Sequence, residues 1–436
     1  MLNEKVEMRN LKGTFDFLPK EQRIRNKIIN TLQQVFELYG YQPVETPILC
    51  HYDVLASKYS GGSEILKEVY KLQDQGEREL ALRYDLTVPF ARLIAMNPNL
   101  TFPFKRYEIG KVYRDGPVKV GRNREFYQCD VDAIGVKGVT LEAELLLLAF
   151  HVFKKLEIDV YIKYNNRKLM SGLIEIAGIN KEIVKDVITI VDKIKKITKA
   201  EFEKELNDIG LSNEQIEKLH TLFSMDLNSI KQQFGNLENQ NINEGLTELY
   251  ELEGYLSQTD ILKNCKLDLS LARGHEIYTG TVFEVFTKDG LITSSIGGGG
   301  RFDKIITNFI DNGIEYPACG ISFGLDVIYN YLLLTQKAEE QSSADLYIIP
   351  MGTFAHSMSL AERLREKGVK VEIALNQGSV SKEMKKANKL GMPFVTVIGE
   401  DEITTGKLTI KNMAKSEQKE YTLENIDALC ADILRK

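Results

Sequence analysis

The sequence lacks any apolar run long enough to cross a membrane. Its longest leucine run, Leu145–Leu148, follows Glu142 and Glu144 and is far shorter than the roughly 20 residues that a spanning helix needs. The first ten residues carry four charges and contain no apolar stretch of the signal-peptide kind. We therefore expect a soluble, cytoplasmic protein without a membrane partner.

Cysteine and histidine are scarce, and neither occurs in a spacing that indicates a metal site. The five cysteines include no CxxC pair, and their odd number and scatter argue against a disulfide framework. The five histidines form no HExxH motif and no paired spacing. A zinc site built on these residues is therefore disfavoured, and we expect reduced thiols.

The chain also lacks an excess of positive charge. Its net charge of -6 argues against a protein that coats nucleic acid by bulk charge. Basic residues nevertheless concentrate at residues 105–124, which hold seven of them against two acidic residues. An arginine at a strand end followed by a basic loop fits a phosphate clamp, because guanidinium groups match phosphate oxygens. The alternative is a hairpin whose charges are only solvated.

The first 334 residues mix helical and extended patterns and are predicted to form one α+β domain. Helical spacing of apolar residues predicts a long helix at Glu21–Gly40. Residues 165–258 change to Lys/Glu/Ile/Leu-rich helical periodicity, which predicts a helical insertion. A mostly antiparallel sheet is predicted from β-branched and aromatic segments at Glu79–Leu86, Phe104–Tyr113, Glu125–Gly135 and Tyr278–Phe286.

Residues 335–344 are polar and aperiodic, which predicts a linker, and residues 345–436 then predict a second domain. Strands and helices alternate there, and βαβαβ order implies a parallel sheet with right-handed crossovers. The predicted elements are strands Leu346–Pro350, Val369–Leu375 and Pro393–Ile398 and helices Phe354–Lys367 and Val380–Leu390. The second helix carries one lysine face: Lys382, Lys385, Lys386 and Lys389. This face fits a solvated surface or a phosphate-binding surface.

Four consecutive glycines, Gly297–Gly300, follow the segment LARGHEIYTG at residues 271–280. Such a run permits close backbone approach to a ligand, and it also occurs in plain turns. It has neither the Lys-Ser/Thr ending of a Walker motif nor the context of a dinucleotide fingerprint. Both readings therefore stay open from these residues alone.

Taken in order, the segments resemble the class II aminoacyl-tRNA synthetases and, within them, histidyl-tRNA synthetases of the eukaryotic and archaeal-like type. The likeness covers nearly the whole chain. It implies a class II catalytic domain with an antiparallel sheet flanked by helices, a helical insertion and a C-terminal α/β anticodon-binding domain. The motifs that carry it are KGTFDFLP (12–19), GYQPVETPIL (40–49), LRYDLTVPFAR (82–92), VYRDG (112–116), GRNREFYQCDVD (121–132), LARGHEIYTG (271–280), IGGGGRFD (296–303) and CGISFGLD (319–326).

The resemblance also implies site residues for an enzyme that activates histidine with ATP and transfers it to tRNA. Arg114 and Arg273 would be catalytic, on either side of the α-phosphate of ATP. The histidine substrate would be bound by Asp85, Thr87, Arg114, Gln128, Asp132, Arg273 and Tyr278. ATP would be bound by Arg114, by Arg122 at its phosphates and by Phe126 stacked on adenine.

Mg²⁺ is expected to accompany ATP, held mainly by phosphate oxygens and water. Its protein ligands are not identified by the sequence, although Glu284 is a candidate because it shares a strand face with Tyr278. The lysine face would contact tRNA phosphates. The region of motif 1, with Pro47, implies a homodimer.

Some positions depart from the family pattern. Val327 stands where motif 3 has an arginine that grips ATP, and Ile277 stands at the first tyrosine of the histidine signature. His275-Glu276 replaces the usual Leu-Asp, and Gly116 replaces the glutamate that ends motif 2's FRxE. These departures leave open a catalytically silent paralogue that senses histidine or tRNA, or that regulates an ATP phosphoribosyltransferase.

Two further alternatives are a ligase for another amino acid and a non-enzymatic RNA-binding protein. The histidine signature at residues 271–278 and the pair Gln128 and Asp132 argue against the first. The arginine-rich strand and the glycine run are unexplained by the second.

Overall fold

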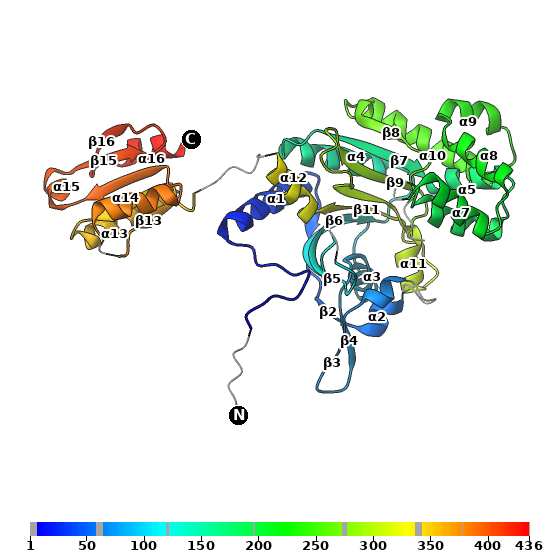
Figure 1. Ribbon diagram of the computed structural model, residues 1–436, viewed down its shortest axis with the longest axis horizontal. Helices are drawn as coiled ribbons and strands as arrows, with labels where there is room; N and C mark the ends of the chain where they lie inside the picture. Colours follow the sequence, from blue (N-terminus) through cyan, green and yellow to red (C-terminus); the bar gives the residue numbers. More distant parts are fainter. Residues whose placement is uncertain are drawn as a thin grey trace. The chain divides into compact units, whose positions relative to one another are not determined.

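The computed structural model describes residues 7–57, 64–118, 122–194, 197–272, 277–335, 342–376 and 378–435. The chain forms two compact units, residues 1–337 and residues 338–436, and each has its own sheet (Figure 1). Each unit also has its own hydrophobic core. Among the described helices, none is both long and apolar enough to cross a membrane.

The larger unit is built on an eight-stranded sheet. Only the pairs β1–β5 and β7–β8 are parallel, and the other neighbours are antiparallel, which confirms the predicted mostly antiparallel sheet. The strand order is β1 (Gln42–Pro43), β5 (Phe104–Tyr113), β6 (Glu125–Ile134), β11 (Ala318–Gly324), β10 (Gly297–Arg301), β9 (Thr281–Thr287), β7 (Val160–Asn166) and β8 (Cys265–Leu267). The glycine run therefore forms an inner strand and not a turn.

Helices α1 (Pro19–Leu38), α4 (Thr140–Lys155) and α12 (Leu325–Leu334) cover one face of this sheet. The ring of Phe323 on β11 lies 5.6 Å from that of Phe36 on α1 and 5.7 Å from that of Phe153 on α4. Apolar residues at helical spacing bury one side of α1, and Gly40 follows its end with a φ of 76°, a conformation that favours glycine. Side chains that alternate with Phe323 along β11 consequently point to the opposite face.

On that opposite face, α3 (Thr87–Met96) and α11 (Asp303–Ile310) pack together around Phe90 and Ile306. A separate small sheet, β2 (Leu49–His51), β4 (Glu79–Leu82) and β3 (Lys71–Gln73), precedes α3. The strand predicted at Glu79–Leu86 thus ends early and joins this small sheet. Beyond it the chain turns into α3, with Asp85 Oδ1 accepting a hydrogen bond from the Val88 amide at 3.0 Å.

The predicted insertion is helical and lies between β7 and β8. Capping boxes start two of its helices, at Thr198 for α7 and at Ser212 for α8, so local sequence specifies these starts. Figure 1 shows most of these helices gathered beside the sheet. They are α5 (Arg167–Ile176), α6 (Val184–Val191), α7 (Lys199–Asp208), α8 (Asn213–Phe223), α9 (Leu227–Phe234) and α10 (Gln240–Ser257).

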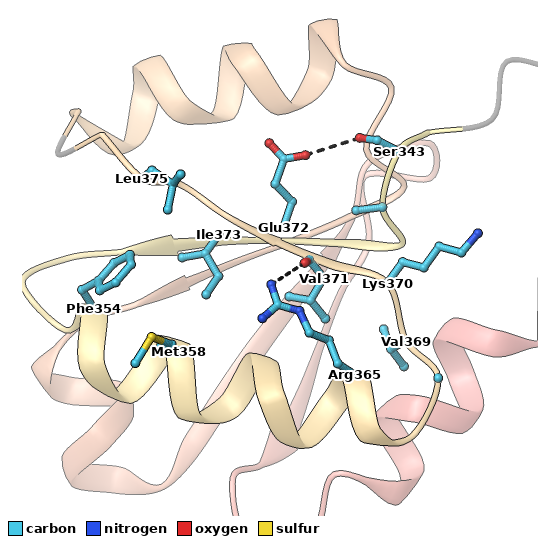
Figure 2. Close-up of a pocket in the computed structure, with 12 residues that line it drawn as sticks. Ser343, Phe354, Met358, Arg365, Val369, Lys370, Val371, Glu372, Ile373 and Leu375 are labelled. Carbon is cyan, nitrogen blue, oxygen red and sulfur yellow. Dashed lines mark hydrogen bonds between the residues drawn. The ribbon is translucent and has the colours of Figure 1, made fainter. Parts of the chain in front are cut away.

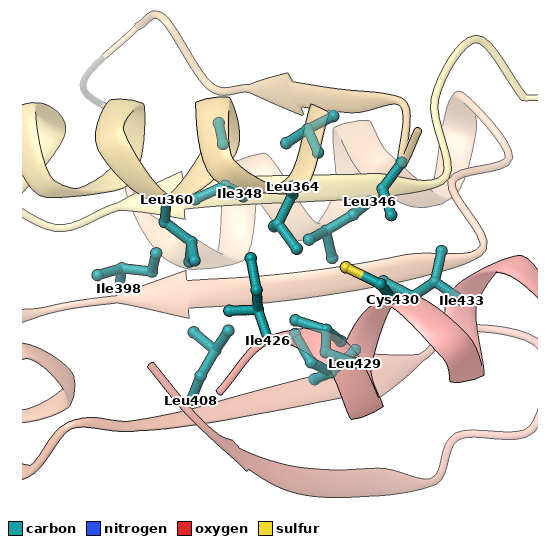
Figure 3. Packing of buried hydrophobic residues seen from close by; sticks show 14 of the residues in the cluster. Leu346, Ile348, Leu360, Leu364, Ile398, Leu408, Ile426, Leu429, Cys430 and Ile433 are labelled. Carbon is teal, nitrogen blue, oxygen red and sulfur yellow. The ribbon is translucent and has the colours of Figure 1, made fainter. Parts of the chain in front are cut away.

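The smaller unit has a five-stranded sheet, in the order β13 (Val371–Ile373), β12 (Leu346–Pro350), β14 (Phe394–Ile398), β15 (Lys407–Asn412) and β16 (Gln418–Thr422). The first three strands are parallel, as predicted, whereas β15 and β16 add an antiparallel hairpin. Helices α13 (Phe354–Glu366) and α16 (Asp427–Leu434) cover one face, where Leu364 and Leu429 meet in the core of Figure 3. Helix α14 (Val380–Lys389) covers the other face.

Candidate active site

The site face of the large sheet, opposite α1 and α4, carries polar side chains and glycines. Directly paired residues of neighbouring strands point to the same side, so each row of pairs gives one line of side chains across this face. Three rows cross its middle: Arg106, Asp132, Gly320 and Gly300; Glu108, Asp130, Ser322, Gly298 and Glu284; and Gly110, Gln128 and Gly324.

Asp132 lies buried at the centre of the first row, with 5% of its surface exposed. Its Oδ2 is 2.6 Å from Nη2 of Arg106 on β5. On the other side stands Gly320, where an added Cβ would lie only 1.8 Å from Asp132 Oδ1. The glycine therefore makes room for this carboxylate, which the sequence predicted to accept from the imidazole of histidine.

Asp130 stands two residues before Asp132 on the same face and is also buried. Among the described residues, its Oδ1 has no hydrogen-bond partner. Burial, followed by the nearby Asp132 carboxylate, raises the pKa of Asp130 to about 7 against the opposing effects of Arg106 and of a hydrogen bond with Ser322. Two carboxylates and the Arg106 guanidinium are thus buried on the site face, and the guanidinium is in contact with Asp132.

Arg106 belongs to a buried ionic network that sequence reasoning missed. Its side chain has no exposed surface, and Nη1 lies 3.5 Å from Oε2 of Glu108. Glu108 Oε1 accepts from Arg83 Nη1 at 2.7 Å and from the amide and hydroxyl of Thr46 at 2.9 and 2.8 Å. Within β5, the charged residues Arg106 and Glu108 stand on either side of Tyr107 and so share one face of the strand. Because a strand inside a sheet seldom buries charges without partners, this pattern could have predicted the network.

Asp85 and Thr87, the predicted contacts of the substrate amino group, lie at the start of α3. Asp85 is buried, and Thr87 is partly exposed as the first residue of the helix. Leu86 lies between them in the chain, and its carbonyl accepts a hydrogen bond from Arg106 Nη2 at 3.2 Å. Because Arg106 also contacts Asp132, the start of α3 is linked to the first row. The structure therefore brings the two predicted ends of the histidine site to one network.

Phe126 and Gln128 lie in the first half of β6, and Arg114 directly follows the end of the neighbouring strand β5. Gln128 pairs with Gly110 and Gly324, so its side chain lies between two positions that have none. Arg114 donates from Nε to the Tyr84 carbonyl at 3.2 Å, and its guanidinium carbon lies 5.1 Å from the Phe126 ring centre. The predicted phosphate arginine and adenine-stacking ring are thus neighbours.

Tyr278 packs against Gly300, which belongs to the first row. A Cβ at Gly300 would lie 3.0 Å from Cδ1 of the Tyr278 ring, so the glycine leaves space for this ring. Ile277, which replaces a signature tyrosine, packs instead against the apolar cluster of α3 and α11. Arg273, the second predicted catalytic arginine, lies outside the described residues, as do His275 and Glu276.

Arg122, predicted at the ATP phosphates, forms an ion pair with Glu68 of η2 (Glu64–Glu68). Glu68 stands against Gly116, where a Cβ would lie 2.8 Å from the carboxyl carbon. Gly116 stands where the family's motif 2 has a glutamate. The carboxylate of Glu68, which comes from an earlier segment, fills the space next to this glycine.

The basic stretch 105–124 is not a continuous free cationic surface. Arg106 is buried, and most of the other cations have a nearby carboxylate partner, which offsets their charge. These pairs are Lys105–Glu144 at 2.7 Å, Lys111–Glu125 at 2.7 Å, Arg122–Glu68 and Arg124–Asp115 at 3.3 Å. Lys119 lies outside the described residues.

Two further residues, Val327 and Ser322, lie in the motif 3 region. Val327 of α12 lies beside Gly324, with its Cγ2 3.3 Å from where a Cβ would stand, so it borders the Gln128 row. The residues Gly320 to Gly324 also spell GxSxG, yet Ser322 lies within β11 and not on a strand-to-helix turn. It therefore has no nucleophile-elbow geometry.

The described residues contain no group of three or more histidine, cysteine or acidic side chains placed to hold a metal ion. Glu284 of β9 lies half-buried on the site face, but Tyr278 precedes β9 (Thr281–Thr287), so the expectation that the two share a strand face was wrong. A carboxylate oxygen of this kind suits Mg²⁺, which usually takes one or two carboxylates and fills its other positions with phosphate oxygens and water.

In the smaller unit, Lys382, Lys385, Lys386 and Lys389 are all exposed on α14. Lys386 donates to the Tyr347 hydroxyl at 3.1 Å, and that hydroxyl donates to the buried Glu383 at 2.7 Å. A separate pocket of about 740 Å³ lies at β13, where Figure 2 shows Phe354 and Met358 of α13. The lysine face and this pocket are separate features of the unit.

A sheet of this topology with a motif 2 arginine, a polar amino-acid site on one face and a separate α/β unit is that of a class II aminoacyl-tRNA synthetase. Residues 13–328 match the family model described as histidyl-tRNA synthetase, and residues 345–432 match an anticodon binding domain. The chain belongs to the histidyl-tRNA synthetase family.

Relatives and solved structures agree with this assignment. The chain is 47% identical to histidine–tRNA ligase 1 of Bacillus cereus, over 97% of this chain and 99% of that one. It is 43% identical to histidine–tRNA ligase 2 of Shouchella clausii, over 94% and 97%. The crystal structure of histidyl-tRNA synthetase from Nostoc superposes with a TM-score of 0.87 at 29% identity, over 99% of this chain and 100% of that chain. These relatives are bacterial, so they give no support to the eukaryotic and archaeal-like type expected from the motifs.

Proposed function

We propose that this protein is a histidine–tRNA ligase, which forms histidyl adenylate and pyrophosphate from histidine and ATP and then esterifies the 3′-end of its tRNA. The observation that carries the proposal is the convergence of Asp132, Gln128 and Tyr278 on one face of the sheet beside Arg114. A site of fixed polar partners rejects apolar amino acids, because they would leave those partners unpaired.

In the first step, the histidine carboxylate attacks the α-phosphorus of ATP and pyrophosphate leaves, so no protein nucleophile is needed. Catalysis then consists of positioning and charge stabilisation. Arg114, oriented by the Tyr84 carbonyl, would offset charge on the α-phosphate oxygens, and Arg273 would do so from another side. Asp85 and Thr87 would bind the substrate ammonium.

Mg²⁺ would accompany ATP and neutralise its outer phosphates, with Glu284 as the carboxylate offered from β9. Phe126 would stack on adenine, and Arg122 would reach the phosphates after leaving Glu68. In the second step, the ribose 3′-hydroxyl of tRNA would attack the carbonyl carbon of the adenylate, the bond to the α-phosphate would break and AMP would leave. The exposed lysines of α14 would contact phosphates of the same tRNA.

We also propose a homodimer that acts in the cytoplasm, where tRNA charging supplies protein synthesis. Exposed apolar side chains near motif 1 support the dimer, because such groups mark protein interfaces. They include Leu18, Ile48, Leu49 and Leu72. Light scattering of the purified protein tests this state, and a monomer at micromolar concentration would contradict it.

The decisive experiment is histidine-dependent ATP–pyrophosphate exchange, with threonine and proline tested in parallel. Wild-type protein should exchange with histidine alone. The Arg114→Lys variant keeps the charge without the planar fork and should lose most of the exchange rate, whereas Lys389→Ala in the smaller unit is the matched control and should retain it.

The second candidate is a histidine or tRNA sensor without catalytic activity, which Val327 at the motif 3 arginine position favours. Histidine binding measured by calorimetry, without any exchange, would establish the sensor and refute the ligase. Exchange supported by threonine or proline would instead refute the assignment of the amino acid.

A further inference from the structure

The proposed roles leave the buried network around Arg106 without a function. We propose that Arg106 is a positioning residue that keeps the Asp132 carboxylate ionised and aimed at the substrate ring, in opposition to the charge of Asp130. The inference rests on the proposed histidine–tRNA ligase function and deepens it, because it concerns how the enzyme recognises imidazole.

Arg106 is enclosed on every side that the structure describes. Its Nη2 lies 2.6 Å from Asp132 Oδ2 and 3.2 Å from the Leu86 carbonyl, and its guanidinium carbon lies 4.1 Å from the Phe90 ring centre. With no exposed surface, this guanidinium is not available to a phosphate. It therefore acts through Asp132 and not on the substrate.

The competing group is Asp130, which shares the face and the strand with Asp132. Like charges in a buried site oppose each other's ionisation, and a cation reverses that effect. The pKa of Asp130 is raised by burial first and by Asp132 second, and Arg106 lowers it. A hydrogen bond with Ser322 lowers the pKa of Asp130 as well, whereas the short contact of Arg106 is with Asp132, so Arg106 favours the charge on Asp132 most directly.

The other charged groups around Asp132 leave this assignment unchanged. Strand β5 contributes Arg106 and Glu108, and the segment before α3 contributes Asp85. Glu108 lies closer to Arg83, at 2.7 Å, than to Arg106, at 3.5 Å, so it has its own cation. From the described parts of β11 and β10, the facing residues are Ser322 and glycines, and Cys319 lies on the opposite face.

The ionised state matters because a carboxylate accepts hydrogen bonds only, whereas the protonated acid also donates. A neutral imidazole presents one N–H donor and one acceptor nitrogen. An ionised Asp132 therefore fixes which ring nitrogen faces it, and this requirement disfavours amino acids that have no donor at that position.

The test measures histidine-dependent exchange of the full-length protein from about pH 6 to about pH 8.5, the range in which such groups titrate. Replacing Arg106 by glutamine should raise KM for histidine about tenfold near neutral pH, with little change in KM for ATP or in kcat. The acid limb of kcat/KM for histidine should move upward by about one pH unit. The substrate's own imidazole titrates in every variant, so only differences between variants count.

A compensating second substitution distinguishes this positioning role from a general structural role. In the Arg106→Gln/Asp130→Asn double variant the neighbouring charge is gone, so the acid limb should return toward that of the wild type. Asp130→Asn alone should move the limb to lower pH, and this variant tests the inference even if Arg106→Gln fails to fold. Lys105→Gln is the matched control, since Lys105 is the strand neighbour on the opposite face, and its profile should not move.

Two outcomes would overturn the inference. One is a loss of kcat with equal rises in both KM values and an unmoved acid limb, which would make Arg106 purely structural. The other is an Asp130→Asn profile identical to that of the wild type. If the wild-type protein shows no exchange with histidine, the proposed ligase function fails instead, and histidine affinity measured by calorimetry over the same pH range tests Arg106 separately.

Discussion

Gly320 shows at the scale of one residue how a missing side chain shapes the site. A Cβ there would lie 1.8 Å from Asp132 Oδ1 and 2.8 Å from the Val131 carbonyl oxygen, so Gly320→Ala must displace the carboxylate. We expect KM for histidine to rise about tenfold or more, equivalent to at least about 1.4 kcal/mol. Gly254→Ala, on α10 with no neighbour within 4 Å, is the control, and equal effects of the two would contradict this role.

Asp130 carries a prediction about stability and pH. Its folded-state pKa of about 7 lies above the unfolded value of about 3.9, so the folded protein binds the proton more tightly. Folding stability attributable to this group is therefore fully present below about pH 4, falls as the pH rises toward about 7, and stays lowered above that.

Asp130→Asn removes this cost, which is on the order of a few kcal/mol, so the variant should melt at a higher temperature than the wild type at pH 8. The difference should shrink at pH 5. Calorimetric melting at both pH values measures it, and a larger gain at pH 5 than at pH 8 would show that the sign is wrong.

A family motif names candidate residues of the site, but the sequence does not show which charged residues are buried. Gln128, Asp132 and Phe126, which the motif names, alternate along β6 and so lie on one strand face, whereas their binding roles stay predictions. Arg106 was instead counted with a basic surface, because a sequence gives the charge of a side chain but not its partners. Its partners come from β6 and from the start of α3, which the fold alone brings together.

At the scale of elements, helix α12 carries Val327 where the family's motif 3 has an arginine, and a substitution can restore that arginine. Val327 borders the Gln128 row at the place of the motif 3 arginine, so Val327→Arg should extend a guanidinium toward the nucleotide. We expect KM for ATP to fall a few-fold while KM for histidine stays constant. Val327→Lys lacks the planar fork and should give a smaller gain; an unchanged KM for ATP in both variants would mean that ATP is gripped elsewhere.

Helix α14 carries the tRNA prediction. Replacing the exposed lysines Lys382, Lys385 and Lys389 by alanine should weaken tRNA binding and lower the slope of log affinity against log salt by about 2, if each contacts one single-strand phosphate. Filter binding at several salt concentrations measures the slope. Lys415→Ala, an exposed lysine outside this helix, should leave the slope unchanged, and an unaltered slope in the triple variant would remove the helix from the interface.

Helices and the strands rich in β-branched or aromatic residues, such as β5 and β6, followed from the sequence more readily than the glycine strand and the C-terminal hairpin. The apolar stripe and terminal glycine of α1 are local signals, and so are the capping boxes of the insertion. Strand β10 is glycine throughout apart from Arg301, so propensity argued against a strand, and pairing with β9 and β11 decided the outcome. Strand β15 alternates, with Leu408 and Ile410 buried, whereas β16 is mostly charged and exposed, and neither strand was predicted.

At the scale of the whole molecule, the two units have separate cores, so activation of histidine should not need the smaller one. A chain that ends at Thr335 should retain histidine-dependent exchange and lose most charging of tRNA. Exchange and aminoacylation assays on the same preparation test this division. Loss of both activities in a truncated protein that melts cooperatively would show that the units depend on each other.

The floor of the amino-acid site has a consequence for altering its substrate. Gly298, Gly300 and Gly320 contribute no side chains to the site face at these positions of β10 and β11, so nothing there can be shortened further. A variant that accepts a bulkier ring must gain its space from the walls, at Tyr278 or Gln128. In a combinatorial library, randomised codons therefore belong at those walls, whereas any change in the floor can only make the cavity shallower.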